Sequence, residues 1–203
     1  MDPVLAPPAA EAGVPAPTRP RTPLHTRRIT YQGYQRDDGL YEIEAELIDT
    51  KGYRTPMRER GLLEPGQPVH HMVVRVAVDT GLRIHEAAAW MLSTPFGECS
   101  TAAAPVERLV GASIGKGWRR TIDEAMGGVG GCTHLRELIS ALGTATIQTI
   151  SGHAEHDRRT EEEAGAAAPD APMPYYVGKC KTWDTAGPVV RRLMPQFYRP
   201  REG

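Results

Sequence analysis

The chain has 203 residues, 40% of them hydrophobic, and a formal net charge of −1, a composition typical of a globular protein. Its 24 lysines and arginines balance 25 aspartates and glutamates, which argues against a dedicated nucleic-acid-binding protein. No stretch reaches the ~18 apolar residues that a membrane span needs. The N-terminus also lacks the layout of a secretory signal, so we expect a cytoplasmic protein with no membrane partner.

The N-terminal half predicts a tail followed by a β-hairpin. Residues 1–26 are rich in proline and alanine, so we expect a disordered tail there. Strands are predicted at 29–34 and 40–48, joined by a tight turn at Asp37-Asp38-Gly39. Residues 49–69 contain three prolines and are predicted to form a loop. Within the second strand, apolar residues alternate with polar ones, which predicts an antiparallel sheet with one wet face; the apolar positions are Tyr41, Ile43, Ala45 and Leu47.

A second hairpin and three helices complete the predicted domain at 27–150. The hairpin pairs residues 72–78 with 82–91 around Asp79-Thr80-Gly81, and its open edge leaves a homodimer by strand pairing as an alternative. Helices are predicted over 101–109, 118–126 and 133–150. We expect a flexible linker at 151–173 and a C-terminal segment at 174–203 that packs back on the domain. The predicted fold class is α+β, an antiparallel strand meander followed by helices packed on one face.

The most informative run is a glycine-rich stretch, residues 127–131, followed by Cys132 and His134 at the start of the longest predicted helix. The positive end of a helix dipole favours the thiolate form of a cysteine placed there. This makes Cys132 a candidate metal ligand or nucleophile. The other two cysteines are Cys99 and Cys180, and three cysteines do not make a disulfide scaffold.

A metal site is the first hypothesis for these residues. Zinc binds thiolates and neutral imidazoles in sets of four, or of three plus water. His70, Cys99 and Cys132 are candidate ligands from three separate loops, with His134 as the fourth. A different residue or water is the alternative for that fourth position: His71, Cys180, a carboxylate or water.

Two other hypotheses stay open. In the first, Cys132 is the nucleophile of a cysteine- or zinc-dependent enzyme that acts on a small molecule, activated by His134 or His70. In the second, the cysteines are purely structural, because cysteine is among the most buried residue types, and the chain is an interaction module. A metal site needs several ligands and a nucleophile needs one thiol, so Cys99→Ser separates the two chemical hypotheses.

Several motifs resemble those of an uncharacterised bacterial family that is known only as a domain of unknown function. The likeness covers residues 27–150 and 174–198 and implies no activity. At the C-terminal cysteine the chain departs from the family pattern, with Gly178 and Lys181 where that pattern has Asp and His. The motifs are Tyr34-x-Arg36-x-Asp38-Gly39-Leu40, Glu44-x-x-Leu47-x-Asp49-Thr50-Lys51, His70-x-Met72, Gly131-Cys132-Thr133-His134-Leu135 and the late Cys180.

The order of elements over residues 70–150 is also similar to that of the NifU-like iron–sulfur scaffold domain. Cys99 and Cys132 fall where the scaffold has its second and third cysteines, and His70 stands near the place of the first. This resemblance implies a NifU/SufE-like arrangement and a metal- or iron–sulfur-related accessory protein. The cofactor that it implies is zinc or an iron–sulfur cluster.

Overall fold

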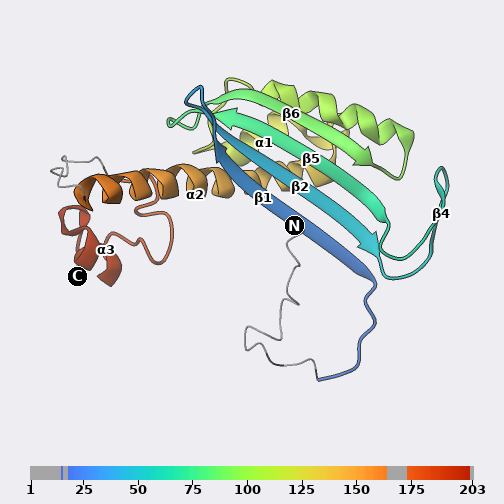
Figure 1. The fold of residues 1–203 in the computed structure, drawn as a ribbon, viewed down its shortest axis with the longest axis horizontal. Coiled ribbons are helices and arrows are strands. Elements are labelled where there is room, and N and C mark those ends of the chain that lie inside the picture. Colours follow the sequence, from blue (N-terminus) through green and yellow to red (C-terminus); the bar gives the residue numbers. More distant parts are fainter. Residues whose placement is uncertain (1–14, 16–17, 164–172, 202–203) are drawn as a thin grey trace.

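The computed structural model describes residues 15, 18–163 and 173–201. It shows one four-stranded antiparallel sheet with helices on one face, so the α+β class is confirmed (Figure 1). Most of the predicted tail at 1–26 lies outside the described residues. The strands are β1 (His25–Gln35), β2 (Tyr41–Lys51), β3 (Thr55–Met57), β4 (Gly61–Leu63), β5 (Pro68–Val78) and β6 (Ile84–Ser93). The helices are η1 (Gly97–Leu109), α1 (Trp118–Met126), η2 (Gly128–Gly130), α2 (Thr133–Glu163), α3 (Pro188–Leu193) and η3 (Pro195–Phe197).

The sheet has the order β1-β2-β5-β6, so each strand lies beside the next long strand in the chain. The first turn is as predicted: Gly39 has a φ of +85° and Asp38 Oδ1 accepts a hydrogen bond from the Leu40 amide. In the second turn Asp79 caps the amide of Arg83, but the residue with positive φ is Leu82, at +66°, and not Gly81. The predicted loop at 49–69 contains the end of β2, the small β3–β4 hairpin and the start of β5.

Helix boundaries differ from the sequence predictions in two places. The segment at 97–109 is a 3₁₀-helix, with Pro105 inside it; proline removes a helical hydrogen bond and clashes with the preceding turn. Helix α2 continues past Ile150 to Glu163, so residues 151–163 are helical where we expected a linker. Ion pairs of Glu155 with Arg158 and Arg159 support this extension, because residues three and four apart face each other on a helix. The division into domains otherwise stays a prediction.

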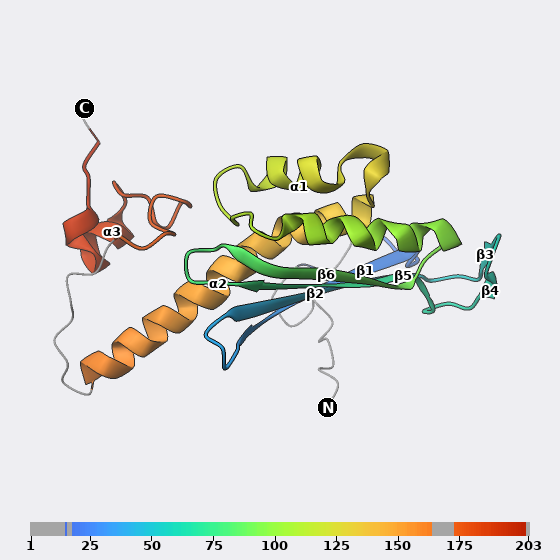
Figure 2. The ribbon, with the colours of Figure 1, turned by 90° about the horizontal axis from the view of Figure 1, so that it is seen from above.

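The core lies between the sheet and helices η1, α1 and α2 (Figure 2). Strand β2 alternates strictly between buried and half-buried residues, which places its glutamates on the open face and its apolar side chains under the helices. Helix α2 contributes the predicted stripe, with Leu135, Leu138, Ile139, Leu142 and Thr146 all buried. Within the described residues, no helix is long and apolar enough to cross a membrane.

Candidate metal centre

A buried carboxylate ends the inward-facing stripe of strand β2. Asp49 follows Leu47 on that face and its side chain is only 4% exposed. It lies in register with Arg27 of β1 on one side and His70 of β5 on the other. A row of three polar residues therefore crosses the sheet at the edge of an otherwise apolar layer, where a single ionised group would be costly to bury.

Arg27 and two histidines satisfy the Asp49 carboxylate. The guanidinium donates from Nε to Oδ1 and from Nη2 to Oδ2, both at 2.8 Å. His25 Nε2 lies 3.0 Å from Oδ1 and His70 Nδ1 lies 3.1 Å from Oδ2. Burial alone would raise the pKa of Asp49, but hydrogen bonds and charge attraction from Arg27 and His25 outweigh it and lower this pKa to about 2. Asp49 is therefore a carboxylate at neutral pH.

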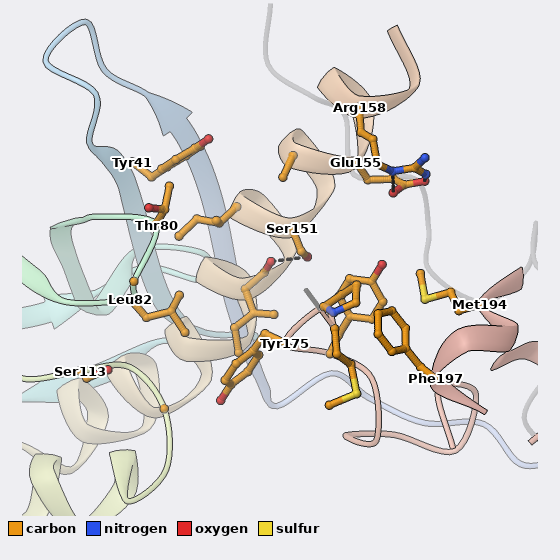
Figure 3. A pocket seen from close by; sticks show the side chains of 18 of the residues that line it. Tyr41, Thr80, Leu82, Ser113, Ser151, Glu155, Arg158, Tyr175, Met194 and Phe197 are labelled. Carbon is orange, nitrogen blue, oxygen red and sulfur yellow. Dashed lines mark hydrogen bonds and ion pairs between the residues drawn. The ribbon is translucent and has the colours of Figure 1, made fainter. Parts of the chain in front are cut away.

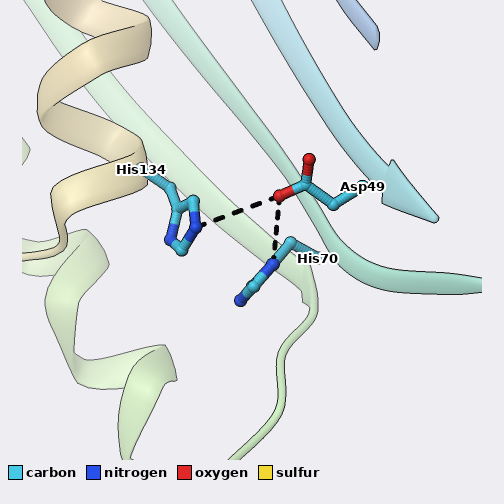
Figure 4. Close-up of side chains that lie close together, drawn as sticks. All are labelled: Asp49, His70 and His134. Atoms are coloured by element: carbon cyan, nitrogen blue, oxygen red, sulfur yellow. Dashed lines mark hydrogen bonds and ion pairs between the residues drawn. The ribbon is translucent and has the colours of Figure 1, made fainter. Parts of the chain in front are cut away.

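The first turn of helix α2 brings a third imidazole, that of His134, to the same carboxylate (Figure 4). His134 Nε2 lies 3.9 Å from Asp49 Oδ2, and its ring centroid is 4.1 Å from that of His70. On the other side of the ring, His134 Nδ1 is 3.7 Å from the Cys132 sulfur. Glu137, one turn further on, accepts a 2.8 Å hydrogen bond from Arg27 Nη1 and so ties α2 to β1.

His70 is half-buried and faces the His134 ring, and both features disfavour its protonation. Burial, followed by the charge that His134 would carry, lowers the pKa of His70 below its usual value. His70 is therefore neutral at pH 7, which is the form that coordinates metals. Asp49, His70 and His134 each offer one ligand atom, and these atoms all lie within 4.8 Å of one another. It is the only group of three or more such residues within the described part of the chain.

The structure brings together part of the predicted ligand set. His70 and His134 meet, and Cys132 touches the outer nitrogen of His134. Cys99 lies in η1 and Cys180 is exposed, and neither belongs to the group. His71 points to the opposite face of the sheet, where its Nε2 is 2.8 Å from Glu46.

Sequence reasoning missed Asp49, Arg27 and His25. The signal for Asp49 was present, because it continues the two-residue alternation of Tyr41 to Leu47 and stands in one of the quoted motifs. Ending the strand at Ile48 hid it, since a residue placed in a loop has no assigned face. Nothing in the sequence of β1 indicated that Arg27 pairs with this carboxylate across 22 residues.

The chain belongs to a family described as protein of unknown function (DUF2889), whose model matches residues 25–148. This range contains the Asp49 cluster, that is, Asp49 with Arg27, His25, His70 and His134 around its carboxylate. No curated protein and no solved structure matches the chain. The likeness to NifU-like scaffolds stays a prediction.

Proposed function

We propose that the protein binds a divalent transition-metal ion through Asp49, His70 and His134. The observation that carries this proposal is that one donor atom from each residue lies within 4.8 Å of the others. One of these donors belongs to the Asp49 carboxylate, which is almost fully buried. One carboxylate and two imidazoles are a ligand set that zinc accepts, with the fourth position left for water or a substrate.

The donor separations suit such an ion. Around a tetrahedral zinc with bonds of about 2.0–2.2 Å, donor atoms lie roughly 3.4 Å apart. Asp49 Oδ2 is 3.1 Å from His70 Nδ1 and 3.9 Å from His134 Nε2, so these two pairs are close to the required separation. The two imidazole donors lie within 4.8 Å of each other. The positive charge of Arg27 opposes a second cation, and its ion pair with Glu137 offsets part of that charge. Arg27 donates two hydrogen bonds to Asp49. A carboxylate can accept about four, so Arg27 does not occupy all the lone pairs of Asp49.

This proposal places the protein among metal-handling accessory proteins. Zinc fits the donor set better than an iron–sulfur cluster, because clusters are held mainly by thiolates. The group of three contains no cysteine, and Cys132 contacts it only through His134 Nδ1. The Cys132 sulfur contacts the nitrogen of His134 that faces away from Asp49, so Cys132 is a partner that would orient His134. It becomes a fourth ligand only if its loop carries the sulfur around the imidazole ring. Second-sphere partners of this kind commonly fix the orientation of a ligand imidazole.

The test is a metal titration of the chelator-treated protein, followed by calorimetry with Zn²⁺ and by absorption spectroscopy with Co²⁺. Wild type is expected to bind one ion. His70→Ala and His134→Ala each remove a ligand, so each should weaken binding by more than the roughly 10- to 100-fold that loss of a second-sphere partner costs. His71→Ala is the matched control, because it removes a neighbouring histidine on the opposite face. Equal binding by His70→Ala and wild type would contradict the proposal.

A second candidate function rests on the 3.7 Å contact between the Cys132 sulfur and His134 Nδ1. With Asp49 beyond the same ring, a thiol, an imidazole and a carboxylate follow one another as they do in cysteine-dependent enzymes. This candidate predicts fast alkylation of Cys132 that falls in His134→Ala, in a Cys99→Ser/Cys180→Ser background. A thiolate-to-cobalt charge-transfer band that disappears in Cys132→Ser would instead make Cys132 a ligand.

A further inference from the structure

A cavity lies between helix α2 and the C-terminal segment at 173–201 (Figure 3). Its volume is about 1010 Å³, at the upper end of the range of sites that hold small organic molecules. His134 and Ser151 are 17 positions apart on α2, which separates the two sites by about 25 Å along the helix. The cavity is therefore separate from the Asp49 cluster.

The two walls of this cavity are mostly apolar. Leu82, Ile147 and Ile150 come from the β5–β6 turn and from α2. Opposite them, Tyr175, Tyr176 and Phe197 contribute aromatic rings. Tyr41, the first residue of β2, adds another ring. Met173 and Met194 add thioethers, which make favourable contacts with aromatic rings and adapt to irregular shapes.

The outer wall is held together by its own contacts, so it is formed before a ligand arrives. Val177 and Val190 are buried within the segment, and the rings of Tyr176 and Trp183 are 4.8 Å apart. The Gly178 amide donates to the carbonyl of Trp183 at 2.6 Å, and Arg201 pairs with Asp184 at 2.7 Å. A wall organised in this way loses little entropy when it binds a partner.

Apolar side chains on this wall are left without close packing. Met173, Tyr175 and Leu193 all line the cavity and are 54%, 46% and 58% exposed. Protein interiors normally pack such surfaces to high density, and a contiguous exposed apolar patch commonly marks a binding site. The cavity has room for a molecule that would cover both walls.

The polar groups of the cavity select against a strongly charged ligand. Glu155 and Arg158 are paired with each other at 2.7 Å, and Lys116 is exposed to solvent. The other polar side chains are neutral hydroxyl and amide groups, on Thr80, Ser113, Ser151 and Gln196. We propose that this cavity binds an uncharged, aromatic small molecule that carries hydrogen-bonding groups at its edge.

The test is binding of phenylnaphthylamine, an uncharged aromatic probe whose fluorescence rises in apolar surroundings, to the full chain. We expect one probe per chain. Ala154→Trp fills the cavity from an exposed position on its α2 wall, so it should weaken binding by at least about tenfold without removing a core contact. Gln148→Trp adds the same side chain to an exposed position on α2 that does not line the cavity, and it should leave affinity unchanged.

Three outcomes would overturn the proposal. The first is no binding by wild type, and the second is equal binding by wild type and Ala154→Trp. The third is a wild-type dimer that Ala154→Trp converts to monomer in light scattering, because a second copy would then be the occupant. Tighter binding of the anionic analogue anilinonaphthalene sulfonate than of phenylnaphthylamine would overturn the uncharged class alone. His70→Ala should leave probe binding intact, so this test is independent of the metal proposal.

Discussion

The two ends of strand β2 differ in what surrounds their inward-facing side chains. Tyr41 and Asp49 are the first and last members of one inward-facing stripe under helix α2. At Asp49 the layer is polar, closely hydrogen-bonded and almost sealed from water. At Tyr41 it is apolar and opens into the cavity beside the C-terminal segment. The Asp49 end is therefore organised by charge and the Tyr41 end by shape.

The largest loss of stability is expected when the Asp49 carboxylate is removed. Asp49→Ala leaves Arg27 and two histidines without their partner, and breaking such a buried pair costs about 3–5 kcal/mol. The free energy of unfolding, measured by urea denaturation in the presence of a chelator, checks this. Glu46→Ala, on the open face of the same strand, is the matched control and should cost less than about 1 kcal/mol. A similar cost for both variants would mean that the network contributes no special stability.

Between these two ends, helix α2 approaches strand β1 closely at Gly33. A Cβ atom at Gly33 would lie 2.8 Å from the Cβ of Thr149, closer than real contacts allow. Gly33→Val should therefore destabilise the protein by about 1–3 kcal/mol, the usual cost of overpacking. Thermal unfolding of Gly33→Val, Thr149→Gly and the double variant measures the coupling. Strict additivity would contradict the close approach, whereas relief in the double variant would support it.

Acid is expected to weaken the polar end selectively. The pKa of Asp49 is lowered to about 2 in the folded protein from 3.8, so the unfolded chain binds more protons between these values. The carboxylate then contributes on the order of 2 kcal/mol above pH 4, and this contribution is lost as pH falls toward 2. The lowered pKa of His70 has the same sign, since the folded state resists protonation as pH falls below about 6.5. The unfolding free energies of wild type and Asp49→Asn, measured between pH 2 and pH 7, test the contribution of Asp49. A difference between the two variants that does not change with pH would contradict it.

The sequence predicts the sheet better than the site. Alternation in β2 and the stripe of α2 report burial directly, so the four strands of the main sheet are found with displaced ends and helix α1 with its correct bounds. The small β3–β4 hairpin is missed, because three prolines indicated a loop there. The extension of α2 is missed because polar residues such as Glu155 and Arg158 stabilise a helix through local ion pairs without an apolar stripe. The pairing of Asp49 with Arg27 and His70 is missed because strand register and a neighbouring helix bring these residues together, and short local motifs do not record either.

The smallest loss of stability is expected at the Tyr41 end of β2, beside the cavity. The Tyr41 hydroxyl lies 3.0 Å from His153 Nδ1, and the His153 side chain is 34% exposed. Water can replace the lost partner there, so Tyr41→Phe should cost no more than about 1 kcal/mol in unfolding free energy. Tyr34→Phe, at an exposed position of β1, provides the baseline. A cost for Tyr41→Phe that equals that of Asp49→Ala would show that hydrogen bonding organises both ends, and the contrast between charge and shape would fail.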